Sequence, residues 1–306
     1  MKKQLTFILT SVLFVIVFYG CQPSAEKYLK SGAIKAEKGD YAGAIKDYTE
    51  AIKLDTFMTE AYNNRGNVKH ELGDAMGAIR DYNRAIEINP SDAKYYFNRG
   101  IATNELGNTN QAMVNYSKAI EIDPGYANAY YNRGNLKSSM KDYKGAIEDY
   151  NKAITLSPDY ADAYYNRGLT RCNLGEFKAA LGDFTKAIEQ KPGFTDAYSN
   201  RAAVKYNLSD FNGAIADYDK AITINPGFAI AYKNRGVIKS KVKDFSGAIE
   251  DFTKAIGLNP KDAVAYNNRA FASREAGDLK GACADWEKAA KLGYGGAKGN
   301  ISKYCK

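Results

Sequence analysis

Residues 127–160 read ANAYYNRGNLKSSMKDYKGAIEDYNKAITLSPDY, and the rest of the chain repeats this pattern every thirty-four residues without insertion or deletion. The tripeptide Asn132-Arg133-Gly134 recurs in the same phase, beginning at Asn64, Asn98, Asn166 and Asn234, and as Asn-Arg-Ala at Asn200 and Asn268. A fixed period of this length predicts stacked supersecondary units, because one unit cannot bury its apolar face alone. We therefore expect function on the surface that the stack presents.

The composition is that of a globular chain with a mild basic excess. Of 306 residues, 45% are hydrophobic and 25% are charged, and the formal net charge is +8. Lysine and arginine are interleaved with aspartate and glutamate, as in residues 144–149 (KGAIED), which indicates a solvated helix face. A nucleic-acid-binding surface would instead gather basic residues on one face, so we expect no nucleic-acid partner.

The first twenty residues differ from the repeats. Lys2 and Lys3 precede an apolar run from Leu5 to Tyr19, which is shorter than the roughly 20 apolar residues that span a bilayer. This pattern predicts a secretory signal peptide at residues 1–20, and the alternative is an uncleaved membrane anchor. In both cases the two lysines favour a cytoplasmic N-terminus and place the repeats outside the inner membrane.

Residues 17–21 (VFYGC) resemble the lipobox of bacterial lipoproteins. The resemblance implies that Cys21 is lipidated and becomes the first residue of the mature chain, with residues 21–24 as a short lipidated tether. In lipoproteins generally, an uncharged residue such as Gln22 after the cysteine suggests the outer membrane. We therefore expect a lipid-anchored protein that faces the periplasm, in the outer membrane rather than the inner.

Each repeat contains two helical stretches with a short break between them, and a proline closes most copies. In the second stretch Ala146, Tyr150 and Ala153 share one helix face, and in the first stretch Tyr130 is followed four residues later by Gly134. We expect the recurring glycine to allow close contact with the partner helix. The copies span residues 25–58, 59–92, 93–126, 127–160, 161–194, 195–228, 229–262 and 263–296, and a capping helix is expected at 297–306.

These columns resemble the tetratricopeptide repeat (TPR) family, whose pattern has an aromatic residue, glycine, alanine, an aromatic residue, alanine and proline over thirty-four residues. The resemblance covers residues 25–296. It implies an all-α fold, a right-handed superhelical solenoid of antiparallel helix pairs, in which the first helices line a concave groove.

Arginine and aspartate recur in two further columns, represented by Arg133 and Asp149. The first repeat keeps Asp47 but has Ser31 in place of the arginine, as expected if each aspartate pairs with the arginine of the next repeat. We therefore predict structural ion pairs between repeats and regard an anion-binding track as the alternative. Asp285, which has no following arginine, is not explained by this scheme.

The predicted groove combines aromatic rings with amides, which can hold an extended backbone because asparagine both donates and accepts hydrogen bonds. The alternative is that the asparagines brace neighbouring helices. Some TPR relatives bind C-terminal carboxylates with a lysine–asparagine clamp, but Val237 replaces that asparagine here, so this specificity is not predicted. The candidate partner-binding residues are Asn64, Asn67, Phe97, Asn98, Tyr131, Asn132, Asn135, Tyr165, Asn166 and Lys233.

The usual catalytic patterns are missing from the sequence. His70 is the single histidine, and there is neither a Cys-x-x-Cys motif nor a glycine-rich phosphate loop, so we expect no enzyme, no cofactor and no metal. Cys172 is interpreted as a small side chain on a groove-side helix. Cys283 and Cys305 bracket the last helix pair and its tail, and an oxidising compartment would allow a disulfide between them.

These features together predict a membrane-anchored TPR scaffold or adaptor that mediates protein–protein interactions in the cell envelope through its groove. The alternative is a structural envelope protein that binds glycan or cell-wall polymer with the same aromatic and amide residues. The oligomeric state is left open.

Overall fold

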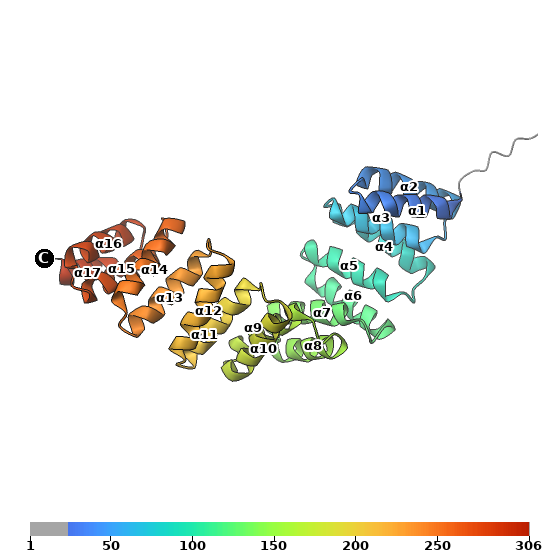
Figure 1. Ribbon diagram of the computed structural model, residues 1–306. Helices are drawn as coiled ribbons and strands as arrows, with labels where there is room; N and C mark the ends of the chain where they lie inside the picture. The colour runs from blue at the N-terminus through green and yellow to red at the C-terminus, as the bar shows by residue number, and fades with distance from the viewer. Residues whose placement is uncertain (1–23, 306) are drawn as a thin grey trace, which may run out of the picture. The chain divides into compact units, whose positions relative to one another are not determined.

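The computed structural model describes residues 24–305, which form seventeen helices and no strand (Figure 1). The predicted signal peptide, Cys21 and the tether up to residue 23 lie outside the described residues. The helices are α1 (Ala25–Glu37), α2 (Tyr41–Leu54), α3 (Thr59–Glu71), α4 (Ala75–Ile88), α5 (Ala93–Glu105), α6 (Thr109–Ile122), α7 (Ala127–Ser139), α8 (Tyr143–Leu156), α9 (Ala161–Asn173), α10 (Phe177–Gln190), α11 (Thr195–Asn207), α12 (Phe211–Ile224), α13 (Ala229–Lys241), α14 (Phe245–Leu258), α15 (Ala263–Glu275), α16 (Leu279–Lys291) and α17 (Ala297–Tyr304).

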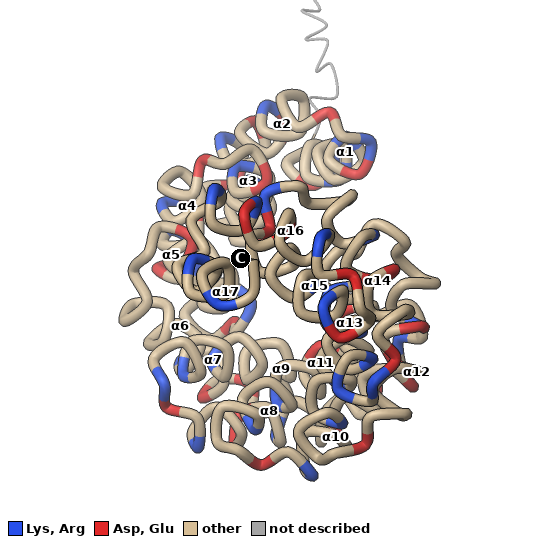
Figure 2. The backbone as a smooth tube through the Cα atoms, turned by 90° about the vertical axis from the view of Figure 1, so that its left-hand side faces the viewer, with Lys and Arg blue, Asp and Glu red and all other residues tan. Residues whose placement is uncertain are grey.

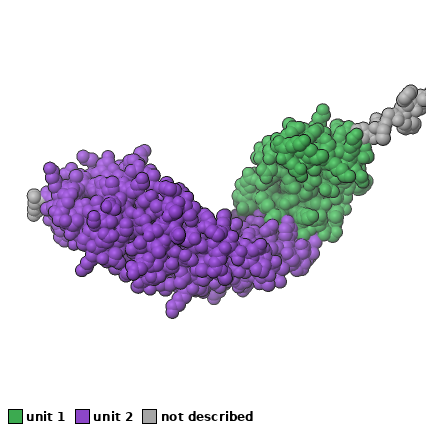
Figure 3. Space-filling model, in the orientation of Figure 1, with its two compact units in different colours: residues 1–108 green, residues 109–306 purple. Residues whose placement is uncertain are grey.

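The helices belong to two compact units, one extending to Asn108 and the other beginning at Thr109 (Figure 3). The boundary falls between α5 and α6, inside the repeat predicted at 93–126. Within each unit, a helix packs on its neighbours in the sequence, so that pairs such as α7 and α8 stack on the next pair. The prediction of an all-α repeat solenoid is confirmed. No helix within residues 24–305 has both the length and the apolar character needed to cross a membrane.

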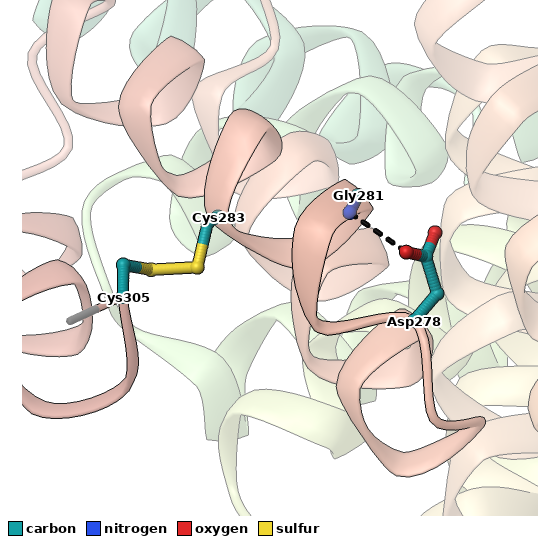
Figure 4. The surroundings of a disulfide bond; sticks show 4 residues. All are labelled: Asp278, Gly281, Cys283 and Cys305. Carbon is teal, nitrogen blue, oxygen red and sulfur yellow. Dashed lines mark hydrogen bonds between the residues drawn. A yellow bond between two sulfur atoms is a disulfide. The ribbon is translucent and has the colours of Figure 1, made fainter.

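The start of most second helices is fixed by an Asp-x-x-Gly pattern, which the sequence-based prediction did not use. At α16 the Asp278 carboxylate accepts a hydrogen bond of 2.8 Å from the backbone N–H of Gly281 (Figure 4). A Cβ atom at Gly281 would lie 2.1 Å from an Asp278 oxygen, so a larger residue would have to displace the capping carboxylate. Equivalent caps join Asp40 to Gly43, Asp74 to Gly77, Asp142 to Gly145, Asp210 to Gly213 and Asp244 to Gly247.

The core of each repeat is the predicted alanine–aromatic–alanine face of the second helix. Ala146 and Ala153 are fully buried, and Tyr150 is 1% exposed. The Tyr150 ring lies on Gly134 of α7, where an added Cβ atom would be 2.9 Å from the ring atom Cε1. This confirms the predicted close contact with the partner helix, because a larger residue at Gly134 would displace the ring.

Candidate functional site

The recurring arginine and aspartate form ion pairs within one repeat, so the predicted pairing between repeats is wrong. Arg133 Nε and Nη2 donate to the two oxygens of Asp149 at 2.9 and 2.7 Å, and Lys137 Nζ lies 2.8 Å from the same carboxylate. The pairing runs sixteen residues forward, from the first helix to the second helix packed on it. It also accounts for Asp285, which pairs with Arg269. The other pairs are Arg65–Asp81, Arg167–Asp183, Arg201–Asp217 and Arg235–Asp251.

The remaining nitrogen of each guanidinium makes the contact between repeats. Arg133 Nη1 donates to Ser117 Oγ of the preceding repeat at 3.2 Å, and the guanidinium lies 5.6 Å from the Tyr130 ring centroid. The hydrogen bond to Asp149 raises the pKa of Arg133 despite burial. All three guanidinium nitrogens of Arg133 are thus engaged within the protein, which uses three of its five N–H donors.

In the first repeat, a serine and a lysine take the place of the arginine as partners of the buried aspartate. Asp47 accepts a hydrogen bond of 2.6 Å from Ser31 Oγ and pairs with Lys35 Nζ at 2.7 Å. Burial acts to raise the pKa of Asp47, but the hydrogen bonds from Lys35 and Ser31 outweigh it and hold the pKa below its usual value. Ser31 therefore replaces the arginine as a direct partner of Asp47.

The predicted groove asparagines bond largely to one another. In the first unit, Asn98 Nδ2 donates to Asn63 Oδ1 at 2.9 Å and to Asn67 Oδ1 at 3.1 Å. In the second unit, Asn166 Nδ2 donates to the Tyr131 hydroxyl and to Asn135 Oδ1, both at 2.9 Å. These amides brace adjacent repeats, which was the alternative interpretation.

The other candidate residues also have partners inside the protein. Tyr165 accepts a hydrogen bond from Asn200 at 2.9 Å. Asn132 donates to the backbone oxygen of residue 128 at 3.1 Å, and Asn64 accepts from residue 63 at 3.2 Å. Lys233 forms an ion pair of 2.7 Å with Asp262. Phe97 is buried.

In two repeats, the buried tyrosine of the second helix bonds to an asparagine of the first helix. Tyr82 and Tyr150 donate through their hydroxyls to Asn67 and Asn135, both at 2.8 Å. Where the ring has no hydroxyl, the position of that asparagine is apolar, as in the pairs Phe184–Leu169, Phe252–Val237 and Trp286–Phe271. The amide supplies an acceptor for a buried hydroxyl, although Tyr48, Tyr116 and Tyr218 have Ala33, Ile101 and Ala203 at the equivalent position.

This coupling predicts a compensating double replacement. We expect Tyr150→Phe and Asn135→Leu each to cost about 1–3 kcal/mol of unfolding free energy, because each removes a hydrogen bond and leaves a polar partner. The double variant, which reproduces the arrangement of Leu169 and Phe184, should cost less than the sum by about 0.5 kcal/mol or more. Urea unfolding of all four proteins measures the coupling, and additive effects would contradict it.

Open apolar space lies on the first helices of the last repeats. A hollow of about 310 Å³ between α13, α14 and α15 is walled by Val237, Phe245 and Phe271. A second hollow of about 180 Å³, between α11, α12 and α13, shares Val237 with the first and includes Tyr206. None of the candidate residues chosen from sequence lines either hollow. We name this surface the α11–α15 face, after its first helices.

The α11–α15 face carries little net charge. Lys233 is paired with Asp262 and Arg274 with Glu275, while Lys239 lies 3.0 Å from buried Asp251. The Ser240 hydroxyl oxygen in the wall of the larger hollow is buried and has no hydrogen-bond partner within residues 24–305. The face is therefore suited to uncharged, apolar groups with a hydrogen-bonding atom.

A more polar hollow occurs in the first unit. It measures about 310 Å³ and is walled by α3, α4 and α5 residues that include the candidates Asn67 and Asn98. His70 also lines it, and its Nε2 lies 2.7 Å from Glu105 Oε2. In the part of the chain that the structure describes, no group of three or more His, Cys, Asp or Glu side chains is arranged to hold a metal ion.

The last helix is held onto the final repeat by a disulfide. Cys283 of α16 is bonded to Cys305 after α17, with Cα atoms 5.7 Å apart (Figure 4). Ile301 and Tyr304 of α17 pack on the core around Trp286, with the Tyr304 ring stacked at 5.5 Å. Cys172 is free and half-buried, and burial raises the pKa of its thiol.

Charged residues are interspersed along the helices of both units, as the sequence predicted (Figure 2). Helix pairs with a repeating core, internal ion pairs and a surface of first helices define a helical repeat protein. The family model for the TPR repeat matches residues 32–73, 66–103, 102–141 and 134–173, and the tetratricopeptide repeat model matches 161–194, 195–228 and 229–262. The chain belongs to the tetratricopeptide repeat family.

Three solved structures illustrate the similarity. MamA is 29% identical, with 55% of this chain and 92% of MamA covered and a TM-score of 0.50. YrrB, described as a TPR protein with an unusual peptide-binding site, is 28% identical, with 60% and 95% covered and a TM-score of 0.55. The C-terminal part of a TPR protein from Cytophaga hutchinsonii shares the fold at 19% identity, with 78% and 98% covered and a TM-score of 0.65. No curated protein matches the chain.

Proposed function

We propose that this TPR protein is a membrane-anchored scaffold in the cell envelope that binds segments of other proteins on its α11–α15 face. The observation that carries the proposal is the pair of adjoining hollows that share Val237. Ligand sites are concave and mostly apolar, with a few polar groups that orient the ligand. The peptide-binding site named for YrrB supports the same use of the fold.

The chemistry of the face favours a partner segment with apolar side chains. The larger hollow is walled by aromatic rings, whose burial on binding supplies most of the affinity. Asn234 and Asn268 line the two hollows. Asn268 Oδ1 accepts a hydrogen bond from Asn267 at 3.4 Å, and its side-chain N–H groups can still donate to a peptide backbone. The nearby charges are already paired, so an acidic or basic segment would gain little.

The glycan alternative has less support. Flat ring faces are needed to stack on sugars, but the Tyr131 ring packs on Tyr160 at a centroid distance of 4.8 Å. The Tyr165 ring packs in the same way on Phe194 at 4.6 Å. These rings contribute more to the contact between repeats than to an open platform.

A charge placed between the two hollows tests the binding surface. We expect Val237→Glu to reduce the partner recovered by cross-linked pull-down from membranes by about tenfold or more, because burying a carboxylate against apolar groups is unfavourable. The matched control is Val264→Glu, since Val264 is an exposed valine of α15 that lines neither hollow. Equal recovery from both variants, with unchanged thermal melts, would exclude the α11–α15 face.

The anchor is tested separately. We expect metabolic labelling with a clickable fatty acid to mark the wild-type protein and to be lost in Cys21→Ser, because the lipid is attached through that sulfur. Equal labelling of the two proteins would rule out lipidation at Cys21. Retention of the unlabelled protein in membranes would then favour the uncleaved anchor.

A further inference from the structure

The turn between α2 and α3 carries an exposed apolar patch, formed by Leu54 and Phe57. Leu54 is 49% exposed and Phe57 is 71% exposed. The turn itself does not need the ring, because the Phe57 backbone N–H donates to Asp55 Oδ1 at 2.9 Å while the side chain extends into solvent. The equivalent positions of the other repeats are Ser91, Gly125, Asp159, Gly193, Gly227, Lys261 and Gly295. An exposed phenylalanine is thus peculiar to the first repeat.

The patch lies at the end of the first repeat where the chain enters α1. Tyr28, in the first turn of α1, and Met58, next to Phe57, pack against the same core cluster. Cys21 precedes Ser24 by three residues, which span at most about 11 Å when extended. A surface that holds Cys21 therefore lies close to the start of α1 and to this end of the repeat.

Charges around the patch are balanced. Lys27 and Lys30 of α1 are accompanied by Glu26 on the same helix and Glu60 on α3. Lys53 is bonded to Glu50 at 2.7 Å. Contact with a membrane at this end would therefore depend on apolar insertion and not on attraction to anionic lipid.

We propose that Leu54 and Phe57 dock on the membrane surface, with the Phe57 ring in the interfacial region; this rests on the membrane anchor in the proposed function. A single ring binds a bilayer weakly, but a tether of three residues gives it a high effective concentration at the surface. The contact adds a second attachment point beside Cys21. It thereby restricts the orientation of α1–α3 on the membrane.

Fluorescence quenching tests the docking. Full-length protein is reconstituted into phosphatidylcholine vesicles whose acyl chains carry bromine, as Phe57→Trp and as the matched control Gly193→Trp. Gly193 occupies the equivalent turn of the fifth repeat, where an added Cβ atom meets no atom within 4 Å. The native Trp286 is fully buried and supplies a constant background. We expect quenching of about twofold or more for Phe57→Trp, and almost none for Gly193→Trp.

The outcomes separate docking from anchoring. Equal quenching of the two variants in protein that floats with the vesicles would overturn the docking and leave the anchor intact. Protein that does not float would overturn both. Quenching confined to vesicles that contain phosphatidylglycerol would contradict the apolar contact. An unquenched Phe57→Trp protein whose copies can be cross-linked to each other would assign the patch to self-association.

Discussion

Asp149→Ala is expected to lower the free energy of unfolding by about 3–5 kcal/mol, because it removes the shared partner of two cations. Asp149 is 4% exposed and bonds to both Arg133 and Lys137. Without the carboxylate, the two positive charges face each other in a poorly hydrated space. Thermal and urea unfolding measure the loss, and hydrogen exchange should place it in α7 and α8, since stability in a repeat stack is partly local.

The control for this variant is Glu148→Ala, which removes a neighbouring, exposed carboxylate. We expect it to change stability by no more than about 0.5 kcal/mol, as is usual for surface substitutions. Similar losses for both variants would show that the buried network is not the source of the effect. A triple replacement of Arg133, Lys137 and Asp149 by apolar residues should be milder than Asp149→Ala, because no buried charge is left unpaired.

Trp286→Ala is expected to cost about 3–5 kcal/mol, since it empties the centre of the last repeat. Trp286 is fully buried, and Phe271 and Tyr304 pack on it at centroid distances of 5.4 and 5.5 Å. α17 should lose most of its protection in hydrogen exchange, while Cys283 and Cys305 continue to hold the end of the chain nearby. The first unit should be unaffected.

The control is Trp286→Phe, because phenylalanine occupies the same column in Phe184 and Phe252. We expect a smaller loss than with alanine, since phenylalanine retains an aromatic ring. The indole Nε1 of Trp286 is buried and has no hydrogen-bond partner among the described residues, so its removal strands no partner. If phenylalanine were as damaging as alanine, packing volume would not explain the effect.

The repeat, its helix pairs and its core could be predicted from the sequence because each depends on periodicity. Ala146, Tyr150 and Ala153 share a helix face whatever the tertiary structure, because their spacing alone places them there. A recurring glycine such as Gly134 indicates a position where a neighbouring helix packs closely. The family followed from the same columns. The candidate site could be predicted only as far as the first helix of each repeat, and not which repeats carry it, since the exposed columns do not show which side chains are engaged by a neighbour.

The tertiary structure decided the partners of the polar residues. Three polar residues lie at a suitable spacing from Arg133 to bond to its side chain: Asn115 and Ser117 before it in the sequence, and Asp149 after it. The angle between the packed helices decides which of them Arg133 reaches. Asn135 links α7 to α8 because it accepts a hydrogen bond from the Tyr150 hydroxyl. The hollows around Val237 each lie between three helices. Sequence by itself determined which residue types recur and on which helix face, whereas hydrogen-bond partners and open space depend on distances between helices, which no linear pattern contains.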